Sequence, residues 1–599
     1  MSGLWKKYSV ALIFSLLLVQ NLQAVRSLGR FVPVQCTDGT FVDCSLKGDE
    51  HLSWFQTSDG TIMCRNSEGL FYKAPDEYVR NLHSLIEKND REILSQQLSA
   101  LTKSTKSKTV DPSWFIYGSR VFKPVGKLTG IVLLVQFQDV KFQDYGKDVR
   151  AIYDEMYNSS GYTSTFVYGG KTYSGAIGSM RDYWVTQSDS AFTPDFYVTE
   201  PVTLSHDFAY YGINDLNGDT QAGNDKRPAE MVSEACLELD KSIDLRQYDS
   251  NRDGFVDFLL VIFAGKGEND LLLYNPDRIW PHTAFPTMET LPVSGLRVVG
   301  YSCSPEIMGG TEDQIDGIGT MTHEMAHLMG LPDYYCYDTT KDVYALGSWS
   351  LMDYGNYNNN GTIPQGLTAL ERYTLGWLDF TDLEASGDYV LADLETSNMA
   401  YRITSNDPGK FLILEGRMKN GWYCCDKSKG LLVTAVDYNE NCWKFNKVIK
   451  SDSEARYRVV PADNHYALNS ENYDCYPYVY SKGRKDSLTM YSYPSMKVGG
   501  VSINKPLSDI RIDGTLVRFH FSDPVNFVHE LENYPLVSVE DNGISVLFDN
   551  YSQGCVSLLA SDGTLLETLA PVNGKCLFCP ATRGIYLIRI GDYTCKVFY

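Results

Sequence analysis

Residues 323–333 read His-Glu-Met-Ala-His-Leu-Met-Gly-Leu-Pro-Asp, and this run predicts a short helix that carries metal ligands. His323 and His327 are one helical turn apart, so both imidazoles would project from the same side, where they can bind one zinc ion. Gly330 and Pro332 are typical of a helix end. Apolar residues recur at intervals of three and four in the same region, as in a helix with one buried face; they are Ile318, Met321, Met325 and Leu328.

Two further residues of the run predict a catalytic zinc rather than a structural one. Asp333 follows the turn at Gly330, and we expect it to swing back as the third ligand. Three protein ligands leave a fourth position for water, whereas structural zinc usually has four protein ligands. Glu324 stands beside the first ligand, and we expect it to act as the general base toward that water. Asp333 could instead hydrogen-bond to a ligand from outside the coordination sphere, and that alternative stays open.

A second segment extends the pattern. Residues 350–354 read Ser-Leu-Met-Asp-Tyr, the form of the methionine turn that lies beneath the zinc in metzincins. Together with the zinc run, the tract 347–352 and the tract 376–378 (Gly-Trp-Leu), this segment resembles the immune inhibitor A family of secreted bacterial metalloproteases. The resemblance implies a metzincin-like α/β zinc protease domain with Met352 as a hydrophobic floor. It also implies a catalytic position for Tyr354, near the metal or the developing oxyanion; an ordinary packed tyrosine is the alternative.

A calcium site is the next expectation. Residues 249–257 read Asp-Ser-Asn-Arg-Asp-Gly-Phe-Val-Asp, which matches the first part of an EF-hand calcium loop. Position 12 is Leu260 instead of glutamate, and the loop runs into an apolar strand, so we expect a rigid structural calcium. A metal-free turn rich in Asp and Asn is the alternative. The predicted side-chain ligands are Asp249, Asn251, Asp253 and Asp257.

The first residues have the plan of a secretory signal peptide. Lys6 and Lys7 precede an apolar run from Val10 to Val19, and we expect cleavage after Ala24. The apolar run is too short to cross a bilayer, which needs about 20 residues, and we expect no transmembrane segment. The chain should therefore be extracellular, either secreted or held at the cell surface. Its 14 cysteines fit export, and some of them should form disulfide bonds in an oxidising compartment.

The pattern along the chain predicts a multidomain α+β protein. After a signal peptide at 1–24 we expect a prodomain at 25–110, a metalloprotease catalytic domain at 111–386, a β-sandwich accessory domain at 387–530 and a small all-β domain at 535–599. The prodomain would end in the basic tract 103–108, an exposed linker that proteases can cut, which predicts a zymogen. An N-terminal domain that stays attached is the alternative.

The last segment carries a second resemblance. Its strand-like pieces end in Gly-Ile-Tyr-Leu at 584–587 and Lys-Val-Phe-Tyr at 596–599, and their order resembles the C-terminal sorting domain of type IX secretion substrates. The resemblance implies that the type IX secretion machinery is a partner of this chain. The terminal Phe598 and Tyr599 differ from the basic ending common in such domains, and an immunoglobulin-like accessory domain is the alternative.

These features together predict a secreted zinc-dependent endopeptidase that acts on proteins or peptides. A net charge of −22 argues against nucleic acid or anionic membranes as partners. Two alternatives remain: a surface adhesin or binding module with a structural metal site, and a zinc hydrolase of a non-peptide bond. Glu324 argues against the first, because a structural site has no need of a base.

Overall fold

The computed structural model describes most of the chain. It covers residues 22–24; 31–84 except 49–52 and 67; 110–522 except 119, 164–165, 169–170, 174, 215–224, 271–274, 287, 310, 312–313, 337–342, 452–454 and 482; and 536–598 except 541–542, 548–554, 573–574, 583 and 591–592. The apolar run of the signal peptide and the basic linker 103–108 lie outside the described residues. The chain forms two compact units, Met1–Phe521 and Ser522–Tyr599. None of the helices within the described ranges has the length and apolarity needed to cross a membrane.

A mixed sheet forms the centre of the first unit. Its strands lie in the order β1 (Leu22–Ala24), β13 (His282–Ala284), β14 (Tyr301–Ile307), β12 (Leu259–Lys266), β7 (Gly126–Gln136) and β10 (Phe192–Val198), and β11 (Val202–Thr203) also pairs with β7. The strands from β14 to β10 run parallel, whereas β13 is antiparallel to β14. β1 then pairs with the outer side of β13, also antiparallel.

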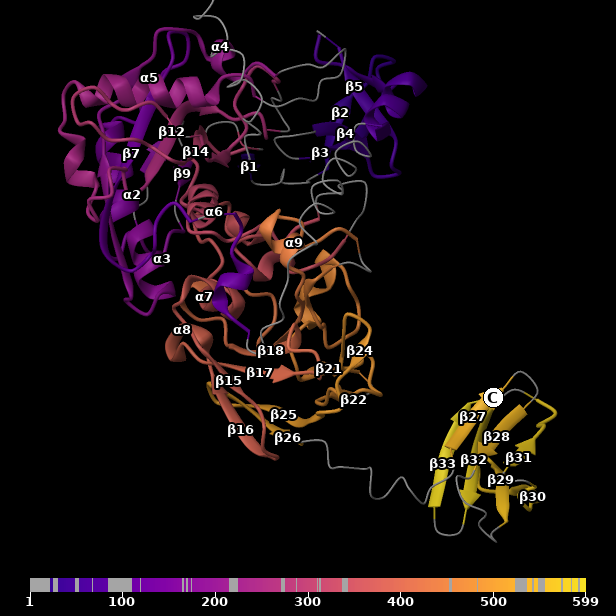
Figure 1. Ribbon diagram of the computed structural model, residues 1–599. Coiled ribbons are helices and arrows are strands. Elements are labelled where there is room, and N and C mark those ends of the chain that lie inside the picture. Colours follow the sequence, from indigo (N-terminus) through magenta and orange to yellow (C-terminus); the bar gives the residue numbers. More distant parts are fainter. Residues whose placement is uncertain are drawn as a thin grey trace, which may run out of the picture. The chain divides into compact units, whose positions relative to one another are not determined.

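Helices cover both faces of this sheet (Figure 1). Alternate residues of β7 explain the arrangement: Val132 and Leu134 pack with α2 (Val149–Asn158), α3 (Met180–Gln187) and α6 (Gly319–Leu328), while Leu133 and Val135 pack with α4 (Phe208–Gly212) and α5 (Pro228–Asp240). A parallel strand buried on both faces has a continuous apolar sequence. Residues 130–137 are almost all apolar because β7 is buried on both faces.

A β-rich region follows α7 (Ala369–Leu375). One sheet has the order β15 (Phe380–Asp382), β17 (Ala400–Thr404), β18 (Lys410–Arg417), β19 (Gly430–Asp437) and β20 (Tyr457–Val459). A second has the order β16 (Gly387–Ala392), β26 (Leu516–Phe521) and β25 (Leu507–Asp513). Leu412 and Leu414 of β18 share a core with Val517 and Phe519 of β26, so the two sheets pack face to face.

The other face of the larger sheet shares a hydrophobic core with α6. Phe411 and Ile413 of β18 lie in the same hydrophobic cluster as Met321 and Met325 of α6. The boundary predicted near residue 386 therefore does not separate two hydrophobic cores. Local alternation predicts that a strand has two apolar faces, but it does not say which element covers each face.

A buried ion pair reinforces this junction. Arg417 donates to Glu415 Oε2 from Nε at 3.0 Å and from Nη2 at 2.7 Å, and its guanidinium lies 4.2 Å from the ring centre of Tyr423. Glu415 Oε1 accepts the backbone N–H of Ala369, the first residue of α7, at 2.9 Å. All these groups are buried. β18 is thus bonded directly to α7.

An N-terminal sheet has its own small core. It is an antiparallel meander of β2 (Val32–Gln35), β3 (Phe41–Gly48), β4 (Ser53–Thr57), β5 (Ile62–Arg65) and β6 (Phe71–Lys73). Its apolar side packs on Trp280, which lies two residues before β13. The segment predicted to be a prodomain therefore contacts the chain just before β13, near the edge of the central sheet.

The second unit is a two-sheet β structure. One sheet contains β27 (Leu536–Glu540), β28 (Gly543–Leu547) and β31 (Lys575–Phe578). The other contains β30 (Leu565–Leu569), β29 (Val556–Ala560), β32 (Ile585–Ile590) and β33 (Tyr593–Phe598). Val546, Val556 and Ile588 share a core, which belongs to this unit alone.

The cysteines differ from the expectation of disulfide bonds. Eleven of the cysteines whose side chains the structure describes are free thiols; they are Cys36, Cys44, Cys64, Cys236, Cys303, Cys424, Cys425, Cys475, Cys555, Cys576 and Cys579. Some cysteines are held by other contacts: Cys303 Sγ lies 3.4 Å from His282 Nδ1, and Cys336 Sγ lies 3.4 Å from the carbonyl oxygen of Lys450. None of these eleven described thiols therefore supports the expectation of disulfide bonds.

Candidate active site

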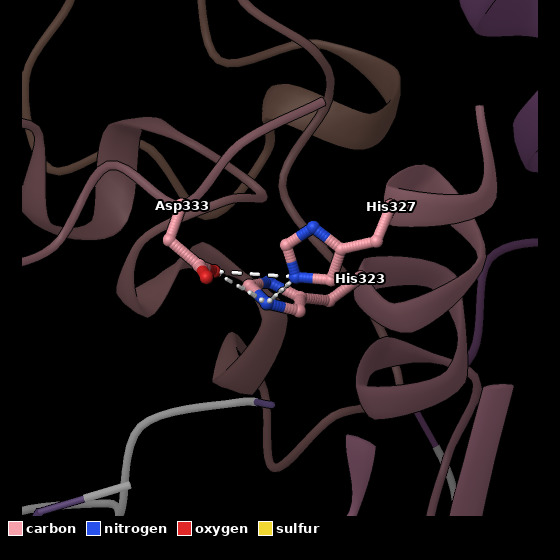
Figure 2. A group of neighbouring side chains, drawn as sticks. All are labelled: His323, His327 and Asp333. Carbon is pink, nitrogen blue, oxygen red and sulfur yellow. Dashed lines mark hydrogen bonds and ion pairs between the residues drawn. The ribbon is translucent and has the colours of Figure 1, made fainter. Parts of the chain in front are cut away.

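The two histidines project from α6 toward one point (Figure 2). His323 Nδ1 lies 2.9 Å from the carbonyl oxygen of Leu351, and His327 Nδ1 lies 2.7 Å from that of Leu331. A carbonyl oxygen only accepts, so each Nδ1 carries the proton and each Nε2 presents a lone pair. The two Nε2 atoms are 3.2 Å apart. The backbone has thus set both rings in the tautomer that binds a metal through Nε2.

Asp333 returns to the histidines through a turn at Gly330. Gly330 has a φ of 95°, in the left-handed region, and a Cβ there would come within 2.8 Å of Ile116 Cγ2. The turn brings Asp333 Oδ1 to 3.1 Å from His323 Nε2 and 3.3 Å from His327 Nε2. Among the residues described, these three form the one group of three or more His, Cys, Asp or Glu side chains close enough to share a metal ion.

The three atoms fit a zinc ion. Zinc lies about 2.0–2.1 Å from a histidine nitrogen in a tetrahedral site, so two ligand atoms should be about 3.3 Å apart. The observed separations are 3.1–3.3 Å. Burial lowers the pKa of His323, which favours the neutral imidazole that a metal needs. Burial alone would raise the pKa of Asp333, but the neighbouring histidines hold it well below its usual range, so the carboxylate is ionised.

Glu324 lies beside His323 on α6 and is buried. Thr283 Oγ1 lies 2.8 Å from both Oε2 and the backbone carbonyl oxygen of Glu324, either of which can accept the one hydroxyl proton, and the same hydroxyl lies 2.8 Å from Ser302 Oγ. Thr283 belongs to β13 and Ser302 to β14, so the edge of the central sheet holds the predicted base. Neither hydroxyl could be predicted from the sequence, because no motif or spacing links Thr283 or Ser302 to the run 323–333.

The segment predicted to form a methionine turn lies against α6. Leu351 supplies the carbonyl that orients His323, and Met352 is buried in the same cluster as Met325. Ser350 Oγ donates to Glu371 Oε1 of α7 at 2.5 Å. Tyr354 is partly buried at the start of η4 (Tyr354–Tyr357), an element that contacts α6. A catalytic role for Tyr354 stays a prediction.

His282 lies on β13 and is buried. Its Nδ1 lies 2.7 Å from the carbonyl oxygen of Trp280 and its Nε2 lies 2.9 Å from the hydroxyl of Tyr301. Both ring nitrogens are therefore engaged away from the zinc ligands.

The predicted calcium loop is closed by its own side chains. Asp249 accepts the backbone N–H groups of Asp253 at 3.0 Å and Gly254 at 3.1 Å, and Asn251 Oδ1 also accepts from Asp253 at 3.0 Å. Asp257 Oδ2 accepts from the backbone of Ser250 at 3.2 Å. These bonds fit a turn with or without a metal, and calcium binding stays a prediction.

The chain was compared with known proteins. Residues 126–381, from β7 to β15, match the family model described as Immune inhibitor A peptidase M6, catalytic domain. Immune inhibitor A of Bacillus thuringiensis subsp. alesti is 29% identical over 258 residues, or 39% of this chain and 37% of that protein. Pre-pro-metalloprotease PrtV of Vibrio cholerae serotype O1 is 27% identical over 266 residues, or 40% of this chain and 28% of that protein.

The chain spans about a third of the length of these curated relatives. The matched region contains the zinc-type ligands, the glutamate beside them and the sheet edge that holds this glutamate. In residues 126–381 this chain is therefore similar to the catalytic domain of the immune inhibitor A peptidases.

Proposed function

We propose that this protein is a secreted zinc-dependent endopeptidase. The observation that carries the proposal is the buried group of His323, His327 and Asp333 with Glu324 beside it on α6. Bound there, zinc would polarise the scissile carbonyl and lower the pKa of the attacking water. Glu324 accepts a proton from that water and later delivers it to the nitrogen of the leaving amine. Thr283 holds Glu324 in position through its 2.8 Å contacts with Oε2 and the backbone carbonyl oxygen.

The edge strand β13 supports a peptide as the substrate. One side of β13 pairs with β14, and among the described residues its other side pairs only with β1. In that pairing Gln23 stands opposite Thr283, the residue that contacts Glu324. An extended polypeptide bound in this way would be held by backbone hydrogen bonds, with its main chain beside the predicted base. Such binding suits a protein substrate better than a small ester or a sugar.

Cleavage of a peptide library by the purified chain tests this function. We expect internal peptide bonds to be cut, the activity to disappear with a zinc chelator and to return on addition of zinc. Binding without cleavage would favour the adhesin alternative, and turnover confined to non-peptide bonds would favour the other hydrolase.

We further propose a structural calcium in the loop 249–257. The support is the set of acidic and amide side chains already folded inward along the loop. Millimolar calcium should raise the melting temperature of the wild type by a few degrees, because a ligand of the folded state stabilises it. Asp253→Ala should lose this shift. Asp244→Asn, an exposed residue outside the loop, should keep it.

The unit Ser522–Tyr599 is proposed to direct export through a type IX system. Its separate core supports an independently folded signal domain, although it suits an immunoglobulin-like module equally. In a bacterium with that secretion system, a chain ending at Phe521 should stay inside the cell while the full chain reaches the medium. Equal export of both would favour the accessory module.

A further inference from the structure

Asn446 contacts the third predicted zinc ligand from outside the matched catalytic domain. It follows α9 (Glu440–Lys444) in the β-rich region, beyond residue 381 where the family match ends. Its Nδ2 donates to Asp333 Oδ2 at 2.7 Å, and its Oδ1 accepts the backbone N–H of Asp333 at 2.6 Å. One amide therefore holds both the main chain and the carboxylate of the same residue.

Because of this contact, the two carboxylate oxygens of Asp333 have different partners. Oδ2 is bonded to Asn446, while Oδ1 faces the two histidines at 3.1 and 3.3 Å. With Oδ2 bonded to Asn446, Oδ1 is the oxygen presented to a metal. The donor is a neutral amide, so it orients the carboxylate without cancelling its charge. A reversed amide would set oxygen against oxygen, and only one orientation satisfies both bonds.

The local fold holds Asn446 in place. Its φ of 54° is in the left-handed region, which asparagine tolerates better than most residues. Its N–H donates to the carbonyl oxygen of Trp443 at 3.2 Å. Trp443 is fully buried, with its ring centre 5.5 Å from that of Phe115 and 5.4 Å from that of Tyr438. The amide is therefore aimed at Asp333 by a packed core rather than by a free loop.

We propose that Asn446 is a positioning residue for Asp333, so that a segment outside the catalytic-domain match completes the zinc site. This inference rests on the proposed function, since it requires that Asp333 bind zinc. Mutation of a residue that hydrogen-bonds to a metal ligand typically weakens metal binding about 10- to 100-fold.

The test measures zinc affinity by competition with a chromophoric chelator, and the melting temperature of the zinc-free protein. Asn446→Gly removes the amide and keeps a residue that accepts the left-handed φ, so we expect about 10- to 100-fold weaker zinc binding. Asn464→Gly is the matched control, because Asn464 also has a left-handed φ, of 62°, but is exposed. Its zinc affinity should equal that of the wild type.

Asn446→Asp is a second variant of nearly the same shape. It would keep an acceptor for the N–H of Asp333 but set a carboxylate against Oδ2, and we expect zinc affinity to fall at least as far. Wild-type affinity in both variants, whatever their melting temperatures, would overturn the inference and leave the proposed function standing. A wild-type chain that binds no zinc would instead overturn the proposed function, and this inference with it.

Discussion

Replacing Glu324 with glutamine should abolish peptide cleavage, with a loss in kcat on the order of 10²- to 10⁴-fold. Glutamine has the shape of glutamate and can still accept the hydrogen bond from Thr283, but it cannot take a proton from the attacking water. The predicted zinc ligands are other residues, so zinc content should stay near that of the wild type. Turnover of a fluorogenic peptide and elemental analysis of the same sample measure the two quantities.

Two further variants serve as comparisons for Glu324→Gln. Glu238→Gln changes an exposed glutamate on α5, far from the zinc ligands in sequence, and should leave kcat unchanged. Thr283→Val removes the hydroxyl that holds Glu324 and should cause a smaller loss in kcat than the loss of the base itself. Retained turnover in Glu324→Gln would rule out the assigned base, and loss of zinc from that variant would mean that Glu324 supports the metal site instead.

Cutting the chain within residues 103–108 should raise its activity. Two contacts lead to this expectation: β1 occupies the outer side of β13 in a chain that still carries residues 1–24, and the N-terminal sheet, which remains after cleavage at Ala24, packs on Trp280 just before that strand. A segment tethered in this way competes with substrate at millimolar effective concentration, so we expect kcat/KM to rise on the order of tenfold or more once it is released.

The experiment places the recognition sequence of a site-specific protease at 103–108 in the full chain and compares peptide cleavage before and after digestion. A chain without that sequence, treated with the same protease, is the control. A chain that begins at Val25 lacks β1 but keeps the N-terminal sheet, so it separates the two contacts. If the uncut chain from Val25 is already as active as the cut one, the N-terminal sheet is an attached structural domain and not a prodomain.

The site residues that could be predicted from the sequence are those that lie close together along the chain. His323, His327 and Asp333 lie within eleven residues, and helix periodicity and a glycine turn are enough to bring them together. Thr283 and Asn446 reach the site from other elements. Neither residue stands out as a site residue in its own segment. Thr283 comes to the site because β13 lies beside α6, and Asn446 because the chain after α9 lies against the turn that follows α6.

The same limit applies to the fold. A continuous apolar run such as 130–137 predicts a buried strand, and β7 occupies most of it. The end of the catalytic domain near residue 386 rested on a change from helical to alternating patterns. Strand β18 contributes to two cores, one shared with α6 and one shared with β26, and a pattern of alternating residues does not name the partner of each face.

The buried pair of Glu415 and Arg417 also bears on how this protein could have diversified. A segment that only followed the catalytic domain could be exchanged between relatives without altering the peptidase. Here β18 bonds the first turn of α7, and the next strand leads to Asn446 at the zinc ligands. Recombination at the end of the matched region would leave Ala369 without its carboxylate and Asp333 without its amide. The predicted metal site therefore depends on the stretch up to Asn446 as well as on the matched region.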